Sequence, residues 1–275
     1  MSYPKTTWRV IEHPPSRGAW NMAVDEAILE GVCSGNSQPT LRLYAWQPAC
    51  LSLGYAQPFS EVDSEALAAK GWDIVRRPTG GRAILHVDEL TYAVIAPDTD
   101  PRVAGSVLDS YLRLSEALLE ALRLIGLSPE ANEKTPEKSR GGFNPVCFEV
   151  PSNYEITVNG KKLIGSAQAR RQGGILQHGA LPLVGDLTRI ITALKFEDDA
   201  ARERAKDRLL AHATTVENEW ITSPDWTQAA EAWINAFQTT LNLDLIPGEL
   251  TSAEKLRADE LMEQKFGHAS WTQRI

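Results

Sequence analysis

The sequence predicts an α+β fold, in which helices flank a mixed β-sheet core. Two observations predict it. Short apolar runs, many of them alternating or β-branched and bounded by proline and glycine, occupy roughly the first two thirds of the chain. From about Leu187 onward, the apolar residues recur at helical spacing instead. Strands grouped ahead of helices favour an α+β fold over a regular βαβ array.

Strand-like runs separated by turns dominate the first hundred residues. Residues 41–46 alternate apolar and polar side chains with the period of two that a half-buried strand requires. We expect strands at Trp8–His13, Leu41–Trp46, Cys50–Tyr55, Asp73–Arg77, Ala83–His86 and Leu90–Ala96. Two helices interrupt them, at Gly18–Gly31 and Glu61–Lys70, because apolar residues recur there every three or four positions.

The longest predicted helix spans Ser106–Leu124 and ends before Gly126, a residue that commonly terminates helices. Its expected apolar stripe is Leu108, Leu112, Ser115, Leu119 and Leu122. The polar segment that follows, Glu130–Asn144, contains one proline and two glycines and is typical of a loop.

A hairpin is predicted around Asn159-Gly160, since Asn-Gly between two strand-like runs is the strongest short hairpin signal. Its strands are expected at 153–158 and 162–166, and Ile175–Leu183 continues the sheet. Four helices follow, at Leu187–Lys195, Asp198–Leu210, Trp226–Leu241 and Ser252–Phe266. The last one is expected to start on Ser252 alone, because Lys255 is not the acid of a capping box.

Composition excludes several classes of function. The 275 residues carry 28 Lys+Arg against 36 Asp+Glu, a net charge of -8, which argues against a general nucleic-acid-binding protein. No stretch approaches the ~20 apolar residues of a membrane span, and residues 1–15 lack a signal-type apolar run. Three cysteines do not suggest a disulfide framework and fit a reducing compartment. We expect a cytoplasmic protein with no nucleic-acid or membrane partner.

Cys147 is the most informative cysteine, because it directly follows the polar loop in Asn144–Pro151. Cys33 and Cys50 have no cationic neighbours in sequence and are expected to be small packing groups. The wide spacing of the cysteines, with no Cys-x-x-Cys pair, makes a structural zinc site improbable. On spacing alone, Cys147 is either a reactive thiol or a buried apolar side chain.

The segment Arg76–His86 contains three arginines and two adjacent glycines, which let a backbone approach a ligand closely and form an anion nest. It matches neither Gly-x-Gly-x-x-Gly nor a Walker loop. A glycine hairpin with solvated arginines is the alternative. The candidate substrate-binding residues in this segment are Arg76, Arg77, Thr79, Gly80, Gly81, Arg82 and His86.

A second basic segment, Lys161–Arg171, begins with Lys162 and continues into the small residues Gly165, Ser166 and Ala167. A lysine beside such a segment can stabilise an oxyanion or lower the pKa of a nearby thiol. A solvated hairpin lysine is the alternative. His178 could serve a cysteine as a base, or it could be a half-buried histidine that binds backbone.

Taken together and in order, these motifs resemble the biotin/lipoate protein ligase and transferase family, and most of all its cysteine-dependent octanoyl transferases of Bacillus-type lipoate assembly. The matching segments are Asn21–Glu26, Leu51–Tyr55, Arg76–His86, Lys162–Gln168, Gln177–Gly179 and the tail from Leu250 to Trp271. The resemblance covers nearly the whole chain. It implies the class II biotin/lipoyl ligase-like fold, with a catalytic domain over residues 1–247 and a C-terminal helical extension, 248–275, packed on it.

The resemblance also implies a reaction. Cys147 would take an octanoyl group as a thioester from acyl carrier protein and pass it to a lysine of a lipoyl domain, the glycine-cleavage H protein. Lys162 would be its polar partner, Arg76–His86 and Gly165–Ala167 would wall the acyl tunnel, and His178 would contact substrate. Neither a metal nor another cofactor is implied. The acidic carrier would be steered to the two basic segments.

Three alternatives remain open. ATP-dependent lipoate ligases resemble the chain, but usually carry a third glycine where Arg82 stands and need no cysteine at position 147. A lipoyl or octanoyl amidotransferase would move the group between lipoyl domains. A non-catalytic lipoyl-domain binder would need neither Cys147 nor Lys162.

Overall fold

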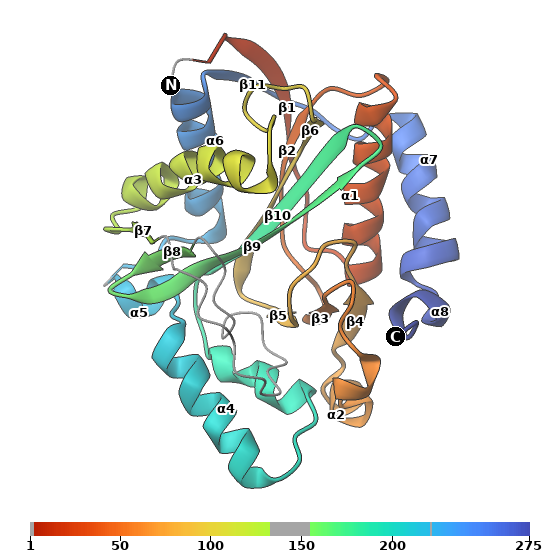
Figure 1. Cartoon of the computed structure of the whole chain (residues 1–275), viewed down its shortest axis with the longest axis vertical. Coiled ribbons are helices and arrows are strands. Elements are labelled where there is room, and N and C mark those ends of the chain that lie inside the picture. The colour runs from red at the N-terminus through yellow and green to blue at the C-terminus, as the bar shows by residue number, and fades with distance from the viewer. Residues whose placement is uncertain (1–2, 133–154, 221) are drawn as a thin grey trace.

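The computed structural model describes residues 3–132, 155–220 and 222–275. Within these residues a mixed sheet of eight strands forms the core, in the order β11-β1-β2-β6-β10-β9-β8-β7 (Figure 1). The strands are β1 Thr6–Glu12, β2 Thr40–Tyr44, β6 Glu89–Pro97, β7 Glu130–Asn132, β8 Glu155–Val158, β9 Lys161–Arg171, β10 Gly174–Pro182 and β11 Leu243–Pro247. β1 pairs in parallel with β11 and β2, and the other pairings are antiparallel, which confirms the predicted mixed sheet.

Helices cover both faces of this sheet. α3 (Val107–Leu124) and α6 (Trp226–Leu241) lie on the left in Figure 1, and α1 (Gly18–Cys33) and α7 (Ser252–Leu261) lie on the right. Alternate residues of each strand point to opposite faces, so Tyr92 and Val94 join the core under α3 and α6, while Ala93 and Ile95 join the core under α1. The α+β class that the sequence predicts is therefore confirmed.

A second sheet of three strands, β4 (Asp73–Arg76), β3 (Cys50–Leu53) and β5 (Ile84–His86), lies at one end of the molecule. Its apolar side chains form a third core with the elements drawn at the bottom of Figure 1. These are α2 (Ser64–Lys70), the 3₁₀ segment Leu187–Ala193 and α4 (Asp199–His212). The turn before β5 contacts the main sheet, because the Thr79 hydroxyl lies 2.6 Å from His178 Nε2 on β10 (Gly174–Pro182).

Local sequence explains several element boundaries. Asn159 and Gly160 both have positive φ, 50° and 76°, as a two-residue hairpin requires, so the predicted hairpin is confirmed. α3 begins with a capping box between Ser106 and Asp109. α7 starts at Ser252 as expected, but its cap is Thr251, which forms a capping box with Glu254, so the expected cap is wrong by one residue.

Other expectations need correction. Of the expected stripe of α3, Ser115 and Leu122 are buried and Leu119 packs against the core, as predicted. Leu108, by contrast, is 45% exposed, and the stripe gains Leu114 and Leu118, which are buried. Glu130–Asn132 forms β7 rather than part of a loop, because it pairs with β8. β11 was not predicted, because five residues ending in proline carry too weak an alternation.

Three short helical elements were not predicted at their observed bounds either. Leu187–Ala193 is a 3₁₀ helix, and Met262–Phe266 forms a π turn that continues α7. α2 starts at Ser64 because the Asp63 side chain caps it, after a separate 3₁₀ turn. The sequence signals gave no indication of α5 (Val216–Glu219) and α8 (Ala269–Thr272), which are four residues each.

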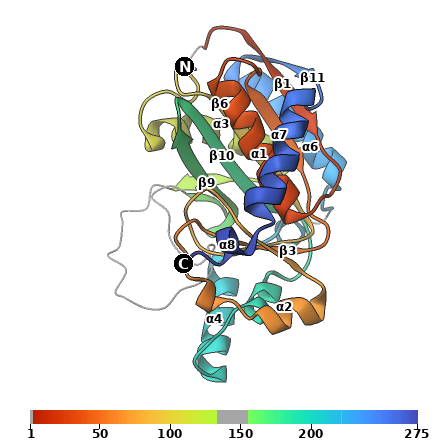
Figure 2. The ribbon, with the colours of Figure 1, turned by 90° about the vertical axis from the view of Figure 1, so that its right-hand side faces the viewer.

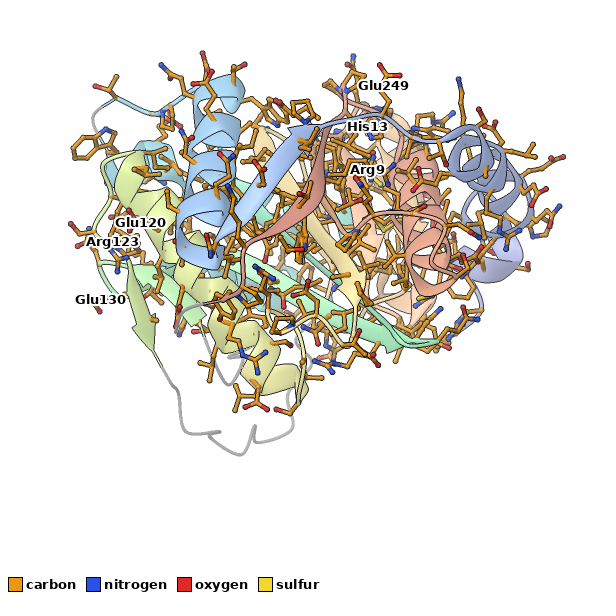
Figure 3. The ribbon with its side chains drawn as sticks, turned by 90° about the horizontal axis from the view of Figure 1, so that it is seen from above. Arg9, His13, Glu120, Arg123, Glu130 and Glu249 are labelled. Carbon is orange, nitrogen blue, oxygen red and sulfur yellow. The ribbon has the colours of Figure 1, made fainter. Side chains whose placement is uncertain are left out.

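Residues 248–275 run along the outside of α1 (Figure 2). Arg9 of β1 forms a bidentate ion pair with Glu254, at 2.8 and 2.6 Å, and donates to the Glu249 carbonyl at 3.0 Å. Figure 3 labels Arg9 and Glu249, which lie on the same side of the molecule. The segment then ends beside the small sheet, where its last residue accepts a hydrogen bond from the Phe59 N–H. Among the described helices, none is long and apolar enough to span a membrane.

Candidate active site

The turn between β4 and β5, residues 77–83, is held by a close backbone approach. A Cβ atom on Gly54, just after β3, would overlap the carbonyl oxygen of Gly81. Gly81 itself has a φ of 92°, a conformation that favours glycine. Gly80 is exposed, with open space around it. The sequence therefore needs glycine at Gly54 and Gly81 to seat the turn against β3.

Arg76 is fully buried and turned away from this turn. Its guanidinium donates to the carbonyls of Gly54, Gln57 and Thr272, at 2.9, 2.6 and 2.8 Å. Trp271 of α8 donates its indole N–H to the Arg76 carbonyl at 2.8 Å. These contacts make Arg76 the link between the turn and the C-terminal segment, and they leave it in a positioning role rather than one of substrate contact.

Arg77 is buried as well, but it binds a different set of partners. It donates to the carbonyl and the hydroxyl of Ser52, at 3.0 and 3.1 Å, and to the carbonyls of Gly80 and Arg82, at 2.8 and 2.7 Å. Arg82 extends outward as a half-exposed side chain, 3.3 Å from Glu61. The three arginines of the motif thus have three different environments, and the alternative interpretation, in which they are solvated, does not hold for Arg76 and Arg77.

His178 of β10 connects the turn to a buried ion pair. Its Nε2 lies 2.6 Å from the Thr79 hydroxyl, and its Nδ1 lies 3.5 Å from Asp25. Asp25 accepts from Arg42 at 2.7 Å and from the Tyr44 hydroxyl at 2.9 Å. His178 therefore binds side chains rather than backbone.

Burial and neighbouring charges set the protonation states of His178 and Asp25 in this chain of hydrogen bonds. Burial lowers the pKa of His178, although Asp25 acts in the opposite direction. Burial also opposes ionisation of Asp25, but Arg42 and His178 outweigh it and lower the pKa of that carboxyl. A neutral His178 then donates from Nδ1 to the carboxylate and accepts from Thr79 at Nε2. Its basic nitrogen is already occupied, so His178 is suited to hold Thr79 rather than to remove a proton from a thiol.

His86 of β5 forms a second chain of this kind. Its Nε2 lies 2.7 Å from the Ser52 hydroxyl, and its Nδ1 lies 2.7 Å from Glu89. The Thr91 hydroxyl donates to the same Glu89 oxygen at 2.5 Å and accepts from the Trp46 indole at 2.7 Å. The Trp46 and His86 rings stack with their centroids 4.0 Å apart.

A narrow cavity lies between these two chains and the main sheet. It has an open volume of about 20 Å³, enough for a single water molecule. Six predicted residues line it, namely Arg77, His86, Gly165, Ser166, Ala167 and His178. Its other lining residues are Met22, Tyr44, Trp46, Ser52, Ile84, Thr91, Gly179 and Ala180. The two predicted basic segments therefore meet at one cavity.

One edge of this cavity is formed by β9. β8 pairs with β9 only from Lys161 to Ile164, and no other described strand pairs with that edge from Gly165 onward. Lys162, which pairs with Thr157 of β8, is buried, and its ammonium lies 3.5 Å from the Glu155 carboxylate. Lys162 is thus not the solvated hairpin lysine of the alternative interpretation, although it does not itself line the cavity.

The predicted nucleophile, Cys147, lies outside the described residues, as does most of the predicted loop, from residue 133 on. Cys50 is buried, and burial raises the pKa of its thiol well above the usual value. Burial, together with Asp98 and Glu30, also raises the pKa of Cys33. Both thiols are therefore protonated at neutral pH, as expected for packing groups. No group of three metal-ligating side chains occurs within the described residues.

Sequence reasoning missed several residues that build the site. Asp25 belongs to the motif Asn21–Glu26, but received no role, and Arg42, Trp46 and Ser52 were assigned only to strands. The one available signal was the charge of Arg42, which interrupts an apolar strand. A buried arginine at such a position needs a carboxylate partner, and Asp25 is that partner. Thr79 was identified, whereas its partner could not be inferred from the sequence.

Comparisons with known proteins identify the family to which this chain belongs. The model of the lipoyl protein ligase A/B catalytic domain matches residues 17–238. Octanoyltransferase LipM of Kyrpidia tusciae is 40% identical over 98% of this chain and 99% of its own length. Octanoyltransferase LipM of Moorella thermoacetica is 39% identical over the same shares. The predicted resemblance is thereby confirmed.

Solved structures match over nearly the full chain as well. A bipartite lipoate protein ligase from Thermoplasma acidophilum superposes with a TM-score of 0.80 at 25% identity, covering 98% of this chain and 96% of that one. A lipoate-protein ligase A solved with bound ATP gives a TM-score of 0.77 at 26% identity, covering 97% and 98%.

Proposed function

Because this chain belongs to the lipoyl protein ligase A/B catalytic domain family, we propose that it is an octanoyltransferase of lipoate biosynthesis. The names of relatives 37–40% identical over nearly the whole chain support octanoyl transfer. The observation that carries the proposal is the cavity itself. It lies where the turn after β4 meets the part of β9 that follows Lys162, whose outer edge no described strand covers, in a protein with a cysteine at position 147.

The proposed first step is acyl transfer to Cys147. Its thiolate attacks the carbonyl carbon of an octanoyl thioester, and a tetrahedral intermediate forms. The carbon–sulfur bond to the donor then breaks, and the donor thiolate leaves and takes up a proton. The candidate donors to the oxyanion are the Lys162 ammonium and backbone N–H groups on the edge of β9 that the described strands leave unpaired.

In the proposed second step, a lysine amine attacks the thioester of the acyl-enzyme. An amide bond forms, the Cys147 carbon–sulfur bond breaks, and the amine loses its proton. One acyl group moves through one covalent intermediate, which predicts ping-pong kinetics. Neither step consumes ATP or requires a metal ion, in keeping with the absence of a Walker motif from the sequence.

We propose acyl carrier protein as the donor and a lipoyl domain, in particular the glycine-cleavage H protein, as the acceptor. Two basic side chains support an acidic partner at this face. Arg171 and Arg274 both lie against the exposed Tyr55 ring, at 5.8 and 3.8 Å, and Arg171 reaches the Pro78 carbonyl at 3.5 Å. The solved structures that resemble this chain include lipoate protein ligases, which also supports a lipoyl domain as the acceptor. These partners imply a cytoplasmic location.

Intact mass spectrometry tests the proposal directly. Octanoyl-carrier protein is mixed with the enzyme, and we expect one octanoyl adduct on the wild type. The adduct should be absent from Cys147→Ser and present on the control Cys33→Ser, whose thiol is a packing group. A lipoyl domain that is modified without any enzyme adduct would contradict the covalent route.

The ligase alternative makes a different prediction. The structural similarity to an ATP-bound lipoate-protein ligase keeps it testable. A ligase needs free octanoate and ATP, whereas the transferase should modify the lipoyl domain from octanoyl-carrier protein alone. Product that forms only with ATP and the free acid would replace the transferase proposal with the ligase. Transfer from an octanoylated lipoyl domain, in the absence of the carrier protein, would favour the amidotransferase.

A further inference from the structure

Two arginines from distant segments meet at one exposed aromatic ring beside the site. The guanidinium of Arg274, in the C-terminal segment, lies 3.8 Å from the centroid of the Tyr55 ring. The guanidinium of Arg171, at the end of β9, lies 5.8 Å from the same centroid. Within the described part of the chain, neither arginine forms an ion pair with a carboxylate. These two side chains, the arginine pair, therefore carry two positive charges that no described acid balances.

The Tyr55 hydroxyl senses the positive potential of this surface. A hydrogen bond from Arg274 and the charge of that guanidinium lower the pKa of Tyr55. Arg171 and Lys265 act in the same direction, although Lys265 is itself paired with Glu26. A guanidinium presents a planar fork of N–H donors that fits two oxygens of one phosphate group. Two such forks at one ring are suited to bind a phosphate.

The arginine pair is connected to the turn that lies over the cavity. The Tyr55 N–H donates to the Thr79 carbonyl at 2.9 Å, and the Arg171 guanidinium donates to the Pro78 carbonyl at 3.5 Å. The side chain of that same Thr79 binds His178, which lines the cavity. The arginine pair therefore lies on the surface that borders the site.

Strand β9 sets the distance between the cavity and the arginine pair. Alternate residues of a strand share a face, so Arg171 lies on the same face of β9 as Gly165 and Ala167, which line the cavity. At the rise of a strand, Arg171 is about 20 Å from Gly165 and about 13 Å from Ala167. The side chain between them on that face, Ala169, is too short to block the way.

The arm on which acyl carrier protein holds its acyl group matches this distance. Extended phosphopantetheine, with about 13 bonds from phosphorus to sulfur, spans roughly 15 Å at the rise per bond of an extended backbone. The arm also contains two amide groups. An unpaired strand edge can bind amides through its main chain, and no described strand pairs with β9 beyond Ile164. A phosphate at the arginine pair thus brings the thioester to the cavity.

We propose that Arg171 and Arg274 bind the phosphate of the donor's phosphopantetheine arm, an inference that rests on the proposed acyl transfer. The arm lies along β9, and its thioester reaches the cavity while its phosphate remains at the surface. The acceptor lysine carries no phosphate, so the arginine pair acts in the first step of the reaction and not in the second.

Two donors that differ only in the phosphate test this site. Octanoyl-phosphopantetheine and octanoyl-pantetheine are offered separately, and the second-order rate constant of enzyme acylation is measured by mass. We expect the wild type to prefer the phosphorylated donor by at least about 10-fold, the factor that one hydrogen bond to a charged group supplies. In Arg274→Ala and in Arg171→Ala this preference should fall below about 3-fold.

The matched control is Arg204→Ala, which removes an exposed arginine from α4 and should keep the wild-type preference. Arg274→Lys keeps the charge without the fork, so its preference should fall between those of the wild type and Arg274→Ala. Thermal unfolding confirms that each variant is folded. Equal rates with the two donors in the wild type, or a full preference in folded Arg274→Ala, would overturn the proposal, because the arginine pair would then have no phosphate to bind.

The two half-reactions separate phosphate binding from support of the fold. With octanoyl-carrier protein, Arg274→Ala should slow acylation of the enzyme at least about 10-fold more than it slows transfer from the acyl-enzyme to the lipoyl domain. Equal slowing of both steps would contradict a site for the donor arm.

A binding measurement separates this proposal from the proposed function. Calorimetry with phosphopantetheine and pantetheine needs no acyl group. We expect the wild type to bind phosphopantetheine at least about 10-fold more tightly than pantetheine, and Arg274→Ala to lose most of this difference. If the difference is found but no octanoyl adduct ever forms, the phosphate site stands and the covalent route fails. An adduct that forms without any such difference supports the covalent route and overturns the phosphate site.

Discussion

The two walls of the site cavity differ in how their polar groups are hydrogen-bonded. The loop wall, residues 76–86, is formed by the turn between β4 and β5, and its Arg76, Arg77, Thr79 and His86 side chains are buried against partners of their own. The edge wall, residues 161–167 of β9, has a strand edge that the described strands leave unpaired beyond Ile164, beside one buried lysine. A wall with its polar groups satisfied provides a fixed frame, and a wall with open backbone groups can bind a reacting carbonyl.

Replacing Asp25 with Asn should produce the largest loss of stability, because it removes the charge that supports the loop wall through His178. The fully buried Arg42 would be left without a compensating carboxylate, which costs about 3–5 kcal/mol. Chemical denaturation measures the change. The control is Asp199→Asn, whose ion pair with Arg202 has the same 2.7 Å length but is exposed, and it should cost under about 1 kcal/mol. Equal losses in both variants would contradict the assignment.

Lys162→Ala should lower the rate of acylation, because Lys162 belongs to the edge wall. Loss of one oxyanion donor reduces acylation by about 10²- to 10³-fold. Single-turnover formation of the acyl-enzyme measures it, with Lys161→Ala, at the half-buried neighbouring lysine of the same hairpin, as the control. A folded Lys162→Ala that is acylated at the wild-type rate would show that Lys162 has no part in the reaction.

Trp271→Phe tests whether the C-terminal segment supports the loop wall. The substitution keeps an aromatic ring against Phe266 and removes the hydrogen bond from the indole to the Arg76 carbonyl. We expect a loss of about 1 kcal/mol in the free energy of unfolding. Leu256→Ala, on the exposed side of α7, should change it little. The reverse order of effects would argue against this support.

The last expected effect is a weakening of the fold in mild acid. Burial, reinforced by Arg42, lowers the pKa of His13 to about 4, and the pKa of His178 is also lowered. Both imidazoles titrate near about 6.5 when unfolded, so below that pH the unfolded state binds more protons. Their contribution is complete above pH ~6.5. The contribution of His13 falls between pH ~6.5 and ~4, by at most about 1.4 kcal/mol per pH unit, and that of His178 also falls below pH ~6.5.

Urea unfolding at several pH values checks the sign. His13→Gln removes one titrating group and keeps an amide oxygen that can accept from the Arg42 Nε–H, as His13 Nδ1 does at 2.8 Å. Its free energy of unfolding should therefore depend less steeply on pH between about 4 and 6.5. A slope as steep as that of the wild type would assign the acid sensitivity to other groups.

Much of the fold could be predicted from local patterns. Asn159-Gly160 predicted its hairpin, and the apolar spacing of Trp226–Leu241 predicted α6 with the same bounds. β11 and Glu130–Asn132 could not be predicted, because each becomes a strand only through pairing with a distant segment. For the site, motif order identified Arg77, His86 and His178, but no local signal pairs Thr79 with His178 across 99 residues.

By itself, the sequence determined the α+β class, the family and the two basic segments that meet at the site. Those properties depend on residue type and spacing along the chain. Only the tertiary structure decided which of the similar side chains do which task. Arg76 holds the C-terminal segment, Arg77 faces the cavity and Trp46 stacks on His86. The physical reason is that burial and partners set the role of a charged or aromatic group, and both come from contacts between distant segments.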